Sequence, residues 1–441
     1  MTNPGPRIRW VRANGVDHKF TGGPPHQPAR SLAVVALTCD VLVIGGGPAG
    51  SAAAITLARA GRDVVLADKA TFPRDKCCGD GLTTLALRLL EGLGLDPLAV
   101  PSWFDVSDVM LRSPTGFEVK LPLPAGSGRY AAVTPRIELD HALVDLARAG
   151  GVQVYDGHGF AGFAAADSAS SVGVELDGIG VVTSRYVVAA DGMWSPVRRA
   201  LGVANPGYLG EWHAFRQYAS GVTGAASEQL MVWFDADLLP GYAWSFPLPG
   251  GRANVGFGVL RDGTRRVQEM KALWPDLLAR EHVRAALGPT AVMEGRHTAW
   301  PIPARVDQAV TGVGRVLLAG DAIAAADPMT GEGIAQALLT GIEAARAIEA
   351  AGALVPGVAR DSYRAAVHHH LVTDHRCSLA LSRVLAHPLG ARGALRLVSW
   401  SGDWGRSAFA RWMFEDEPRA LAVTPSRWHR NLFRRPGAFT D

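Results

Sequence analysis

Three glycines near the start of the chain have the spacing that says most about its chemistry. Residues 40–50 read Asp-Val-Leu-Val-Ile-Gly-Gly-Gly-Pro-Ala-Gly, which gives Gly45, Gly47 and Gly50 the pattern G-x-G-x-x-G. The apolar run before them is typical of a strand, and residues 51–60 favour a helix. In such a turn the first glycine permits the tight bend, the second lets a pyrophosphate reach the backbone, and the third lets helix and strand pack closely. The segment therefore predicts a dinucleotide site.

The residues around this turn supply the expected contacts. Unpaired N–H groups and the dipole at a helix N-terminus favour phosphate, so we expect the pyrophosphate there. A second predicted strand, Val64–Ala67, ends at Asp68, about where an acceptor of ribose hydroxyls is expected. The predicted cofactor contacts of this segment are Gly45, Gly47, Pro48, Ala49, Gly50, Asp68 and Lys69.

The same glycine spacing occurs a second time, at Gly157, Gly159 and Gly162. A stretch containing Ser and Asp follows these residues instead of a clear helix. Because a phosphate site needs the helix, we predict a hairpin here.

Composition is typical of a globular protein of enzyme size. The chain has 441 residues, 48% hydrophobic and 19% charged, so it can bury a large core divided into two or three units. A net charge of +3 is too small to indicate nucleic-acid binding, and no run approaches the roughly 18 apolar residues of a membrane-spanning helix. The four cysteines form no disulfide framework, so a reducing cytoplasm is the expected compartment. We expect no metal site.

Two later segments bring polar residues to the ends of predicted elements. Residues 134–150 predict an amphipathic helix with Arg136 in its first turn. A cation there opposes the helix dipole, so we expect an anion nearby, although a solvated surface arginine is the alternative. A strand predicted over Val181–Ala190 runs into Asp191, which would stand at the edge of a cofactor crevice.

A third segment, residues 315–338, combines a buried strand, a polar turn and a helix. Asp321 follows the strand and could accept hydrogen bonds from hydroxyl groups, while the amides of Gly331–Ile334 open the helix and could donate to a carbonyl. The predicted cofactor contacts of this segment are Gly320, Asp321, Pro328, Gly331, Gly333 and Ile334.

In this order and spacing, the four segments resemble the FAD-dependent oxidoreductases that include the aromatic hydroxylases, flavin halogenases and geranylgeranyl reductases. The resemblance covers about residues 38–350 and implies FAD as the cofactor. It implies that the glycine turn holds the ADP moiety and that Arg136 lies near the pyrophosphate. It also implies that Asp191 borders the cofactor and that Asp321 holds the ribityl chain.

Two short motifs indicate the branch of this group. Residues 72–83, Phe-Pro-Arg-Asp-Lys-Cys-Cys-Gly-Asp-Gly-Leu-Thr, resemble the P-R-x-K-x-C-G-x-G signature of the geranylgeranyl reductase family, particularly its menaquinone-reductase-like members, with Cys78 at the family cysteine. Residues 242–247, Tyr-Ala-Trp-Ser-Phe-Pro, resemble the Y-x-W-x-F-P segment that lines the substrate cavity in that family, and partly match the W-x-W-x-I-P segment of halogenases. The first motif adds Lys76, Gly79, Asp80 and Gly81 to the predicted cofactor contacts, with a solvent-facing Lys76 as the alternative.

The resemblance implies an enzyme that reduces carbon–carbon double bonds of an isoprenoid or lipid-like chain. Reduced flavin would supply a hydride, and the protein an apolar slot, orientation and an acid. Tyr242, Trp244 and Phe246 alternate along a predicted strand and so share one face, which suits a substrate cavity and equally an ordinary core. Cys78, Tyr242 and Trp244 are the candidate catalytic residues, with a buried inert thiol as the alternative for Cys78.

Two other functions fit the same sequence. In a monooxygenase or halogenase of a secondary-metabolite pathway, reduced flavin would meet oxygen at a similar pocket. A flavin-binding protein without turnover would serve as a lipid-binding or structural module. The cysteine signature favours the reductase. Since no second credible dinucleotide turn is present, NADPH or another external donor would bind only transiently.

The predicted fold is mixed α/β, with a Rossmann-type FAD-binding domain, an antiparallel-sheet substrate domain and a helical C-terminal region. Its predicted parts are a disordered leader at 1–37, the FAD-binding domain at 38–108, 129–204 and 296–350, the substrate domain at 109–128 and 205–295, and the helical region at 351–441. Between Arg392 and Arg435, arginines outnumber acidic residues and several tryptophans occur. This composition suits either a solvated helical face or peripheral contact with a membrane.

Overall fold

The computed structural model describes residues 37–440 apart from 166–167, 169, 262–266 and 353–354. The predicted leader, residues 1–37, lies outside the described residues except for Leu37, the first residue of strand β1. That strand is longer than the predicted one because its first residues pair with β11 (Gly180–Ala189) of the same sheet, Leu37 standing opposite Val182.

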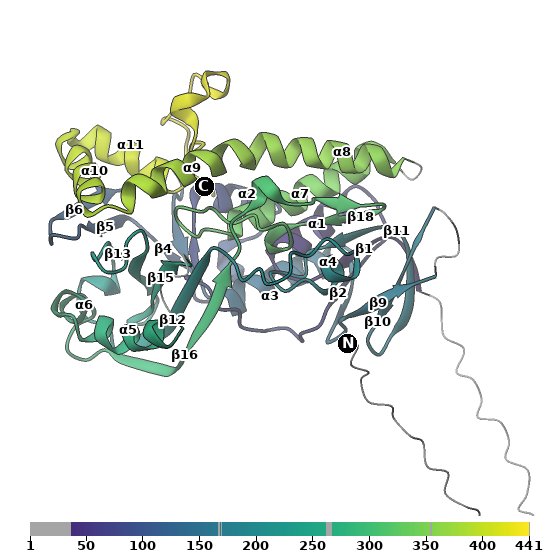
Figure 1. Ribbon diagram of the computed structural model, residues 1–441, viewed down its shortest axis with the longest axis horizontal. Helices are drawn as coiled ribbons and strands as arrows, with labels where there is room; N and C mark the ends of the chain where they lie inside the picture. Colours follow the sequence, from purple (N-terminus) through teal and green to yellow (C-terminus); the bar gives the residue numbers. More distant parts are fainter. Residues whose placement is uncertain (1–36, 166–167, 169, 262–266, 353–354, 441) are drawn as a thin grey trace, which may run out of the picture. The chain divides into compact units, whose positions relative to one another are not determined.

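A sheet of eight strands carries the glycine turn (Figure 1). The strands are β1 (Leu37–Ile44), β2 (Val64–Asp68), β8 (Gln153–Asp156), β9 (Phe160–Ala164), β10 (Val172–Leu176), β11 (Gly180–Ala189), β17 (Gly312–Val313) and β18 (Val316–Leu318). Five of them run parallel in the order β18-β11-β1-β2-β8, while β17, β10 and β9 pair antiparallel. Every residue of β2 is buried, as expected for a parallel strand covered on both faces.

Helices cover this sheet, and two glycines allow close contacts at the N-terminus of α1. They are α1 (Pro48–Arg59), α2 (Thr84–Gly92), α3 (Arg136–Ala149), α4 (Pro196–Ala200), α7 (Ile334–Ala351) and α8 (Pro356–Val367). A Cβ atom on Gly341 of α7 would lie 2.0 Å from the carbonyl oxygen of Ala49 in α1. A Cβ atom on Gly50 would lie 1.7 Å from the carbonyl oxygen of Gly45. The N-terminus of α1 is therefore held against β1 and α7 by backbone contacts that exclude any side chain.

A second sheet has seven strands in the order β16-β12-β15-β14-β13-β5-β6. The strands are β5 (Asp108–Arg112), β6 (Glu118–Pro122), β12 (Trp212–Ser220), β13 (Leu230–Trp233), β14 (Tyr242–Leu248), β15 (Arg252–Leu260) and β16 (Val292–Ile302). All neighbours are antiparallel except β13 and β5, which are parallel. A small sheet of β3 (Gly81–Leu82), β7 (Ala132–Val133) and β4 (Phe104–Asp105) stands beside it.

The two faces of β15 carry side chains of different size. Phe257 faces helices α5 (Val267–Ala279) and α6 (Glu281–Leu287), where it stacks on Phe215 with ring centroids 5.0 Å apart. Gly256 faces the other way, and a Cβ atom there would lie 2.3 Å from the Trp244 ring. Because side chains alternate along the strand, Phe257 packs into a core on one face, while Gly256 leaves room for the Trp244 indole on the other.

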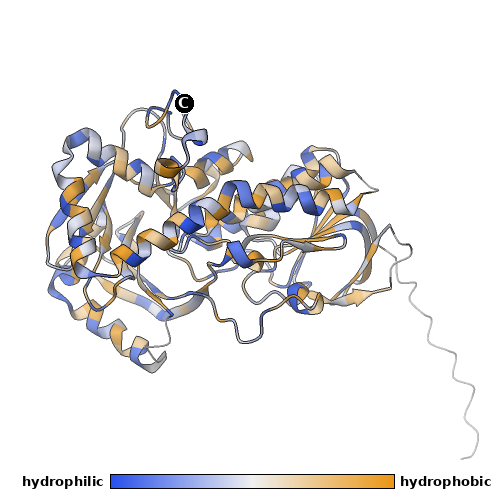
Figure 2. Cartoon of the chain, turned by 45° about the horizontal axis from the view of Figure 1, so that its top comes forward, coloured by the Kyte–Doolittle hydropathy of each residue, from blue (hydrophilic) through white to orange (hydrophobic). Residues whose placement is uncertain are grey.

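The last part of the described chain is helical, as predicted. It contains α9 (Thr373–Leu385), α10 (Pro388–Trp400) and α11 (Gly402–Met413), and a π-helical turn at His368–Val372 joins α8 to α9. Leu395, Val398 and Ala410 of α10 and α11 share a core with β5 and β6. Figure 2 shows hydrophobic residues concentrated along the strands and mixed with hydrophilic ones along the long helices. No helix among the described residues is long and apolar enough to cross a membrane.

The predicted mixed α/β fold with a Rossmann-type sheet and a second, largely antiparallel sheet is confirmed, with one local difference. At Gly157–Gly162 the chain leads into β9, which pairs antiparallel with β10, Phe163 standing opposite Val174, and among the described residues no helix follows these glycines. This arrangement agrees with the predicted hairpin. Helix α1 begins at Pro48 rather than at residue 51, since proline fits the first position of a helix.

The contact between α1 and α7 predicts opposite effects for two glycine substitutions. Gly341→Ala forces α1 and α7 apart, so we expect it to lower the free energy of unfolding by about 1–3 kcal/mol. Gly393→Ala in α10 meets nothing within 4 Å, so helix propensity alone should raise stability by up to about 1 kcal/mol. Thermal unfolding of both variants measures the difference. Equal changes of the same sign would show that the close approach is unimportant.

Candidate functional site

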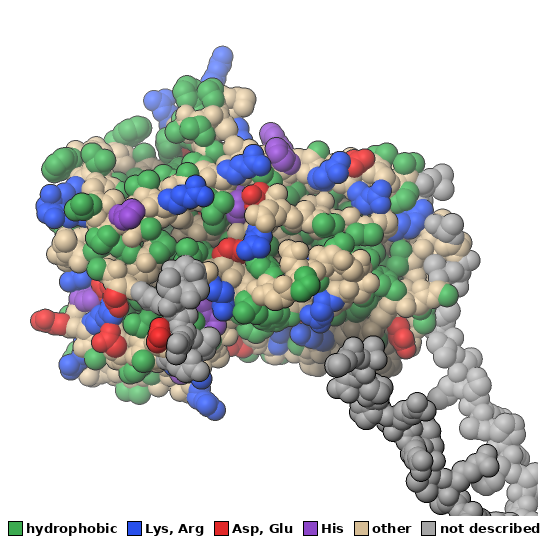
Figure 3. Space-filling view, in the orientation of Figure 1, with side chains coloured by type: hydrophobic (Ala, Val, Ile, Leu, Met, Phe, Trp, Pro, Cys, Tyr) green, Lys and Arg blue, Asp and Glu red, His purple; other side chains and the backbone are tan. Residues whose placement is uncertain are grey.

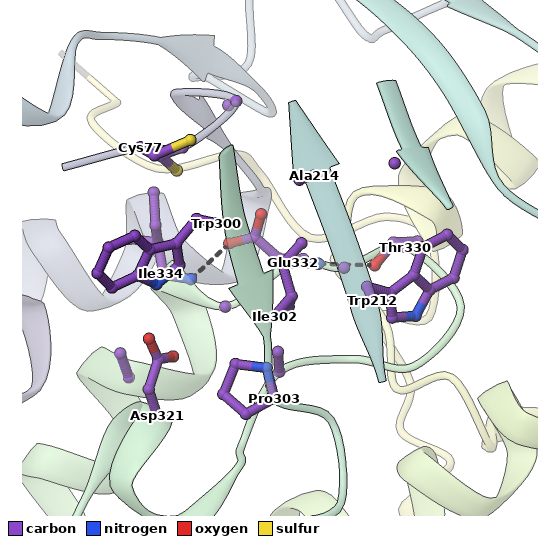
Figure 4. Close-up of a pocket in the computed structure, with 18 of the residues that line it drawn as sticks. Cys77, Trp212, Ala214, Trp300, Ile302, Pro303, Asp321, Thr330, Glu332 and Ile334 are labelled. Carbon is purple, nitrogen blue, oxygen red and sulfur yellow. Dashed lines mark hydrogen bonds between the residues drawn. The ribbon is translucent and has the colours of Figure 1, made fainter. Parts of the chain in front are cut away.

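A cavity of about 900 Å³ lies between the two large sheets and the C-terminal helices. Side chains and backbone from all three parts line it, and Figure 4 shows part of this lining. The sequence-predicted residues that line it are Gly45, Gly47, Pro48, Ala49, Asp68, Lys69, Lys76, Cys78, Gly79, Asp80, Gly81, Arg136, Asp191, Tyr242, Trp244, Phe246, Gly320, Asp321, Gly331, Gly333 and Ile334. Gly50 and Pro328 do not line it. Gly50 packs on Gly45, and the carbonyl of Pro328 accepts a hydrogen bond from the Trp212 indole.

The three glycines of the turn have different surroundings. Gly45 has a φ of +103°, and a Cβ atom there would lie 2.3 Å from the carbonyl oxygen of Ala190, so only glycine fits. Gly47 has an ordinary φ of −78°. The nearest groups to a Cβ at Gly47 are the guanidinium nitrogens of Arg74 at 3.5 Å and Arg136 at 4.0 Å. Gly47 therefore opens onto two cations, an arrangement that fits a pyrophosphate.

Asp68 holds the glycine turn in shape. Its Oδ2 accepts a hydrogen bond from the amide of Gly46 at 2.7 Å, and its Oδ1 accepts one from the amide of Ala70 at 2.8 Å. A carboxylate has about four lone-pair sites, so two remain for ribose hydroxyls. The residue can thus shape the turn and still bind a ribose.

The anion expected beside Arg136 is Asp140, one turn further along α3. Arg136 Nε and Nη2 each donate to Asp140 at 2.8 Å, and Arg74 Nη1 donates to the same carboxylate at 2.7 Å. Burial opposes ionisation of Asp140, but the two guanidinium groups hold its pKa below the usual value. Two cations thus share one anion, which leaves a positive charge beside Gly47. The arginine is buried, which excludes the solvated alternative.

Two acidic side chains on the sheet side fit a polyhydroxylated ligand. Asp321, in a 3₁₀ turn at Gly320–Ile323, pairs with Lys76 at 3.0 Å, so Lys76 lies inside the site in contact with a carboxylate. Asp191 Oδ2 accepts from the amide of Val197, whereas its buried Oδ1 has no hydrogen-bond partner among the described residues. Burial raises the pKa of Asp191. An unpaired buried acceptor fits the hydroxyl groups of a ribityl chain.

The cysteine loop packs directly against the aromatic strand β14. Cβ atoms on Gly79 and Gly81 would lie 3.4 Å and 3.1 Å from the Phe246 ring. Trp244 lies 6.0 Å from both Tyr242 and Phe246 between ring centroids, so the three rings form one wall. The Trp244 ring is largely buried and its Nε1 donates to the side chain of Asn254. Trp244 thus combines both sequence interpretations, as a packed residue that also lines the cavity.

Asp80 connects this loop to the second sheet. Its Oδ2 accepts hydrogen bonds at 2.7 Å from the Tyr218 hydroxyl and the Asn254 amide, and its Oδ1 accepts one from the amide of Arg136. Burial raises the pKa of Asp80 to about 6. Because both side-chain oxygens and the carbonyl, which accepts from the amide of Thr134, already bond the protein, Asp80 serves as a link between β12, β15 and α3.

Both cysteines of the loop line the cavity as neutral thiols. Burial raises the pKa of Cys78 to about 11 and also raises that of Cys77. The carbonyl of Cys78 accepts a hydrogen bond from Asn254. A raised pKa makes a thiol a poor nucleophile at neutral pH, so the geometry suits packing or orientation better than covalent chemistry.

Sequence reasoning missed Glu332, which stands between Gly331 and Gly333 at the N-terminus of α7. Its Oε1 accepts a hydrogen bond from the amide of Ile334 at 2.9 Å (Figure 4). It also accepts one from the amide of Ala335 at 3.2 Å. The Ile334 amide that the sequence assigns to a cofactor carbonyl is therefore bonded to Glu332 here. Burial, followed by the charge of Glu415, raises the pKa of Glu332 to about 8.

Glu415 lies beside Glu332 although it is far along the chain. Its Oε1 accepts from the Gln336 amide at 2.7 Å and its Oε2 from the Thr83 hydroxyl at 3.0 Å. Burial raises the pKa of Glu415 as well. Glu332 lies within the segment 315–338, from which neighbouring cofactor contacts were predicted, so its position was a signal that it belongs to the site. Nothing in the sequence near Glu415 indicates this pairing.

The surroundings of Gly47 predict a selective loss of cofactor. Gly47→Val has an allowed φ, and its Cβ atom would come no closer than 3.5 Å to the Arg74 guanidinium, so we expect the apoprotein to fold with an unchanged melting temperature. The branched side chain would occupy the space of the pyrophosphate and remove bound FAD. Asp321→Ala removes only hydrogen bonds and should weaken FAD binding less, by roughly 1.5–3 kcal/mol. Flavin absorbance after purification checks this, and full FAD occupancy in Gly47→Val would refute the placement of the cofactor.

Comparisons with known proteins agree with this geometry. Residues 38–351 match a family model described as an FAD binding domain. A menaquinone reductase of Mycolicibacterium smegmatis is 34% identical over 339 residues, covering 71% of this chain and 77% of that protein. A digeranylgeranylglycerophospholipid reductase of Methanopyrus kandleri is 32% identical over 307 residues, covering 68% of this chain and 74% of that protein.

Solved structures share the fold. A geranylgeranyl bacteriochlorophyll reductase-like protein of Thermoplasma acidophilum has a TM-score of 0.73 at 22% identity, covering 89% of this chain and 100% of that one. The flavin-dependent halogenase CmlS has a TM-score of 0.65 at 22% identity, covering 89% of this chain and 77% of that one. The family match and the curated relatives together assign the chain: it belongs to the geranylgeranyl reductase family of FAD-dependent oxidoreductases.

Proposed function

We propose that the protein reduces carbon–carbon double bonds of an isoprenoid or similar lipid-like chain. The observation that carries the proposal is one continuous cavity lined by the glycine turn, by the aromatic residues of β14 and by apolar side chains of α9–α11. Relatives named for menaquinone and for a digeranylgeranyl phospholipid support the substrate class. When bound, FAD supplies the hydride for such a reduction.

The reaction requires a proton as well as a hydride. The hydride forms a C–H bond at one alkene carbon as the π bond breaks, and a proton from an acid must form the C–H bond at the other carbon. The protein therefore has to hold an acid that is protonated near neutral pH and faces the cavity.

Glu332 fits the role of this acid better than the sequence-predicted candidates. A group with a pKa of about 8 is mostly protonated at pH 7 and still gives up its proton readily. Cys78, with a pKa of about 11, holds its proton far more tightly. Burial raises the pKa of Tyr242, whose hydroxyl donates to the carbonyl of Thr330. In our proposal Cys78, Tyr242 and Trp244 orient the substrate and Glu332 supplies the proton.

The electron donor is part of the proposal. We propose that NADPH or an external reductase reduces the flavin after transient binding, because the glycine turn at Gly45–Gly50 is the one dinucleotide turn recognised in the sequence. A long isoprenoid resides in a bilayer, so the proposed substrate also implies peripheral contact between the protein and a membrane.

A mass measurement distinguishes reduction from oxygenation. Under anaerobic conditions with chemically reduced flavin, we expect candidate prenyl substrates to gain about two mass units per double bond, as hydride and proton add to it. The halogenase that shares the fold motivates the parallel reaction in air. A gain of about sixteen mass units there, with no anaerobic product, would replace the reductase with a monooxygenase.

The proposed acid predicts a specific pH profile. Because the protonated carboxyl is the active form and its pKa is about 8, turnover should be constant below that pH and fall tenfold per unit above it. Glu332→Gln should lower turnover about 100-fold or more and abolish the fall in turnover at high pH. Its FAD content should be unchanged.

Glu415→Gln is the matched control. It removes the neighbouring charge that raises the pKa of Glu332, so the falling limb should move to lower pH while turnover at acidic pH is retained. Full turnover in Glu332→Gln would exclude this carboxyl as the acid without affecting the assignment of a reductase.

A further inference from the structure

Helix α10 has two apolar faces, one inside the protein and one outside. Ala391, Ala394 and Leu395 point to the cavity and line it. Leu389 and Leu397 are on the opposite side and are 79% and 67% exposed. Burying one face of a helix is ordinary, but an exposed apolar stripe behind it requires another explanation.

The outer stripe continues onto the next helix. On α10, Leu389, Leu397 and Trp400 fall within an arc of about 80° at 100° per residue. Trp400 is 77% exposed and Trp404 at the start of α11 is 76% exposed. We call Leu389, Leu397, Trp400 and Trp404 the C-terminal apolar face. Figure 3 shows hydrophobic side chains and Lys or Arg side chains intermingled over the region of α10 and α11.

The charges around this face are mainly positive. Arg383 and Arg396 are exposed, Arg392 is half-buried, and Arg406 pairs with Asp403, the acidic residue of this stretch. Asp108, Glu118 and Lys120 of β5 and β6 lie near Ser399 and Arg406. Together these residues still leave an excess of positive charge beside a surface rich in tryptophan and leucine. A partner that complements both features must be apolar and carry negative charge at its surface.

We propose that the C-terminal apolar face binds the surface of an anionic lipid bilayer. Tryptophan prefers the interface between headgroups and hydrocarbon, leucine enters the hydrocarbon, and arginine is attracted to anionic headgroups. A second copy of the chain is a poorer partner, because two such faces would bring their arginines together. Since the other side of α10 lines the cavity, binding in this orientation brings the proposed cavity for a lipid-like substrate next to the bilayer.

Vesicle binding tests this proposal without any enzymatic reaction. The FAD-loaded protein is sedimented with vesicles of phosphatidylcholine alone or mixed with phosphatidylglycerol. We expect binding to the anionic vesicles, weakened by salt, and a blue shift of tryptophan fluorescence. The double variant Trp400→Glu and Trp404→Glu should bind at least about tenfold more weakly. Both residues are exposed, so FAD content and melting temperature should not change.

Leu98→Glu is the matched control, because Leu98 is 89% exposed and lies in the 3₁₀ turn Pro97–Ala99, outside the C-terminal helices. It should bind vesicles as well as the unaltered protein does. Equal binding of the tryptophan variant, or no binding to either vesicle, would overturn the proposal. A dimer that the tryptophan variant disrupts would assign the face to a second copy instead. Vesicle binding without reduction of any prenyl substrate would leave this inference standing while the proposed reaction fails.

Discussion

The site depends on the close approach of backbone at the N-terminus of α1. Gly50 lies against Gly45, and Ala49 lies against Gly341 of α7, at distances where no Cβ atom fits. This packing fixes the direction of the first amides of α1, and Asp68 fixes the turn that precedes them through the amide of Gly46. Only Gly47 is left with open space in front of it. The position of an anion in the cavity is therefore set by backbone packing before any side chain contributes.

Charge pairing connects this rigid part to the substrate side. Arg136 and Arg74 share Asp140, while the amide of Arg136 donates to Asp80, which also accepts bonds from Tyr218 and Asn254 of the second sheet. Each buried charge thus has a partner, as burial requires. The same chain of contacts reaches the cysteine loop through the bond from Asn254 to the carbonyl of Cys78. These bonds consequently fix the position of the glycine turn relative to the aromatic residues of β14.

Local order along the chain was enough to predict the Rossmann-type sheet, the glycine turn and the aromatic strand, because each is encoded within a few consecutive residues. Contacts between distant segments were not predictable. Nothing near Lys76 indicates its pairing with Asp321, and nothing near Glu415 indicates that it lies beside Glu332. The strand that pairs with β9 was not predicted for the same reason, since pairing depends on which strand edges remain free. Sequence patterns give elements and their faces, and three-dimensional packing decides which faces meet.

The cavity has walls from three parts of the chain, and this division has a consequence for how the protein can change. Substitutions that are well separated and share no partner usually have additive effects. Residues of α9–α11 such as Leu381 and Leu385 line the cavity yet take no part in the hydrogen bonds around Gly47 and Asp80. Variation in these helices can therefore alter the shape of the cavity without disturbing the hydrogen bonds around the glycine turn. Relatives with different substrates need differ little at the glycine turn, and the C-terminal helices are where exchange between them should transfer selectivity.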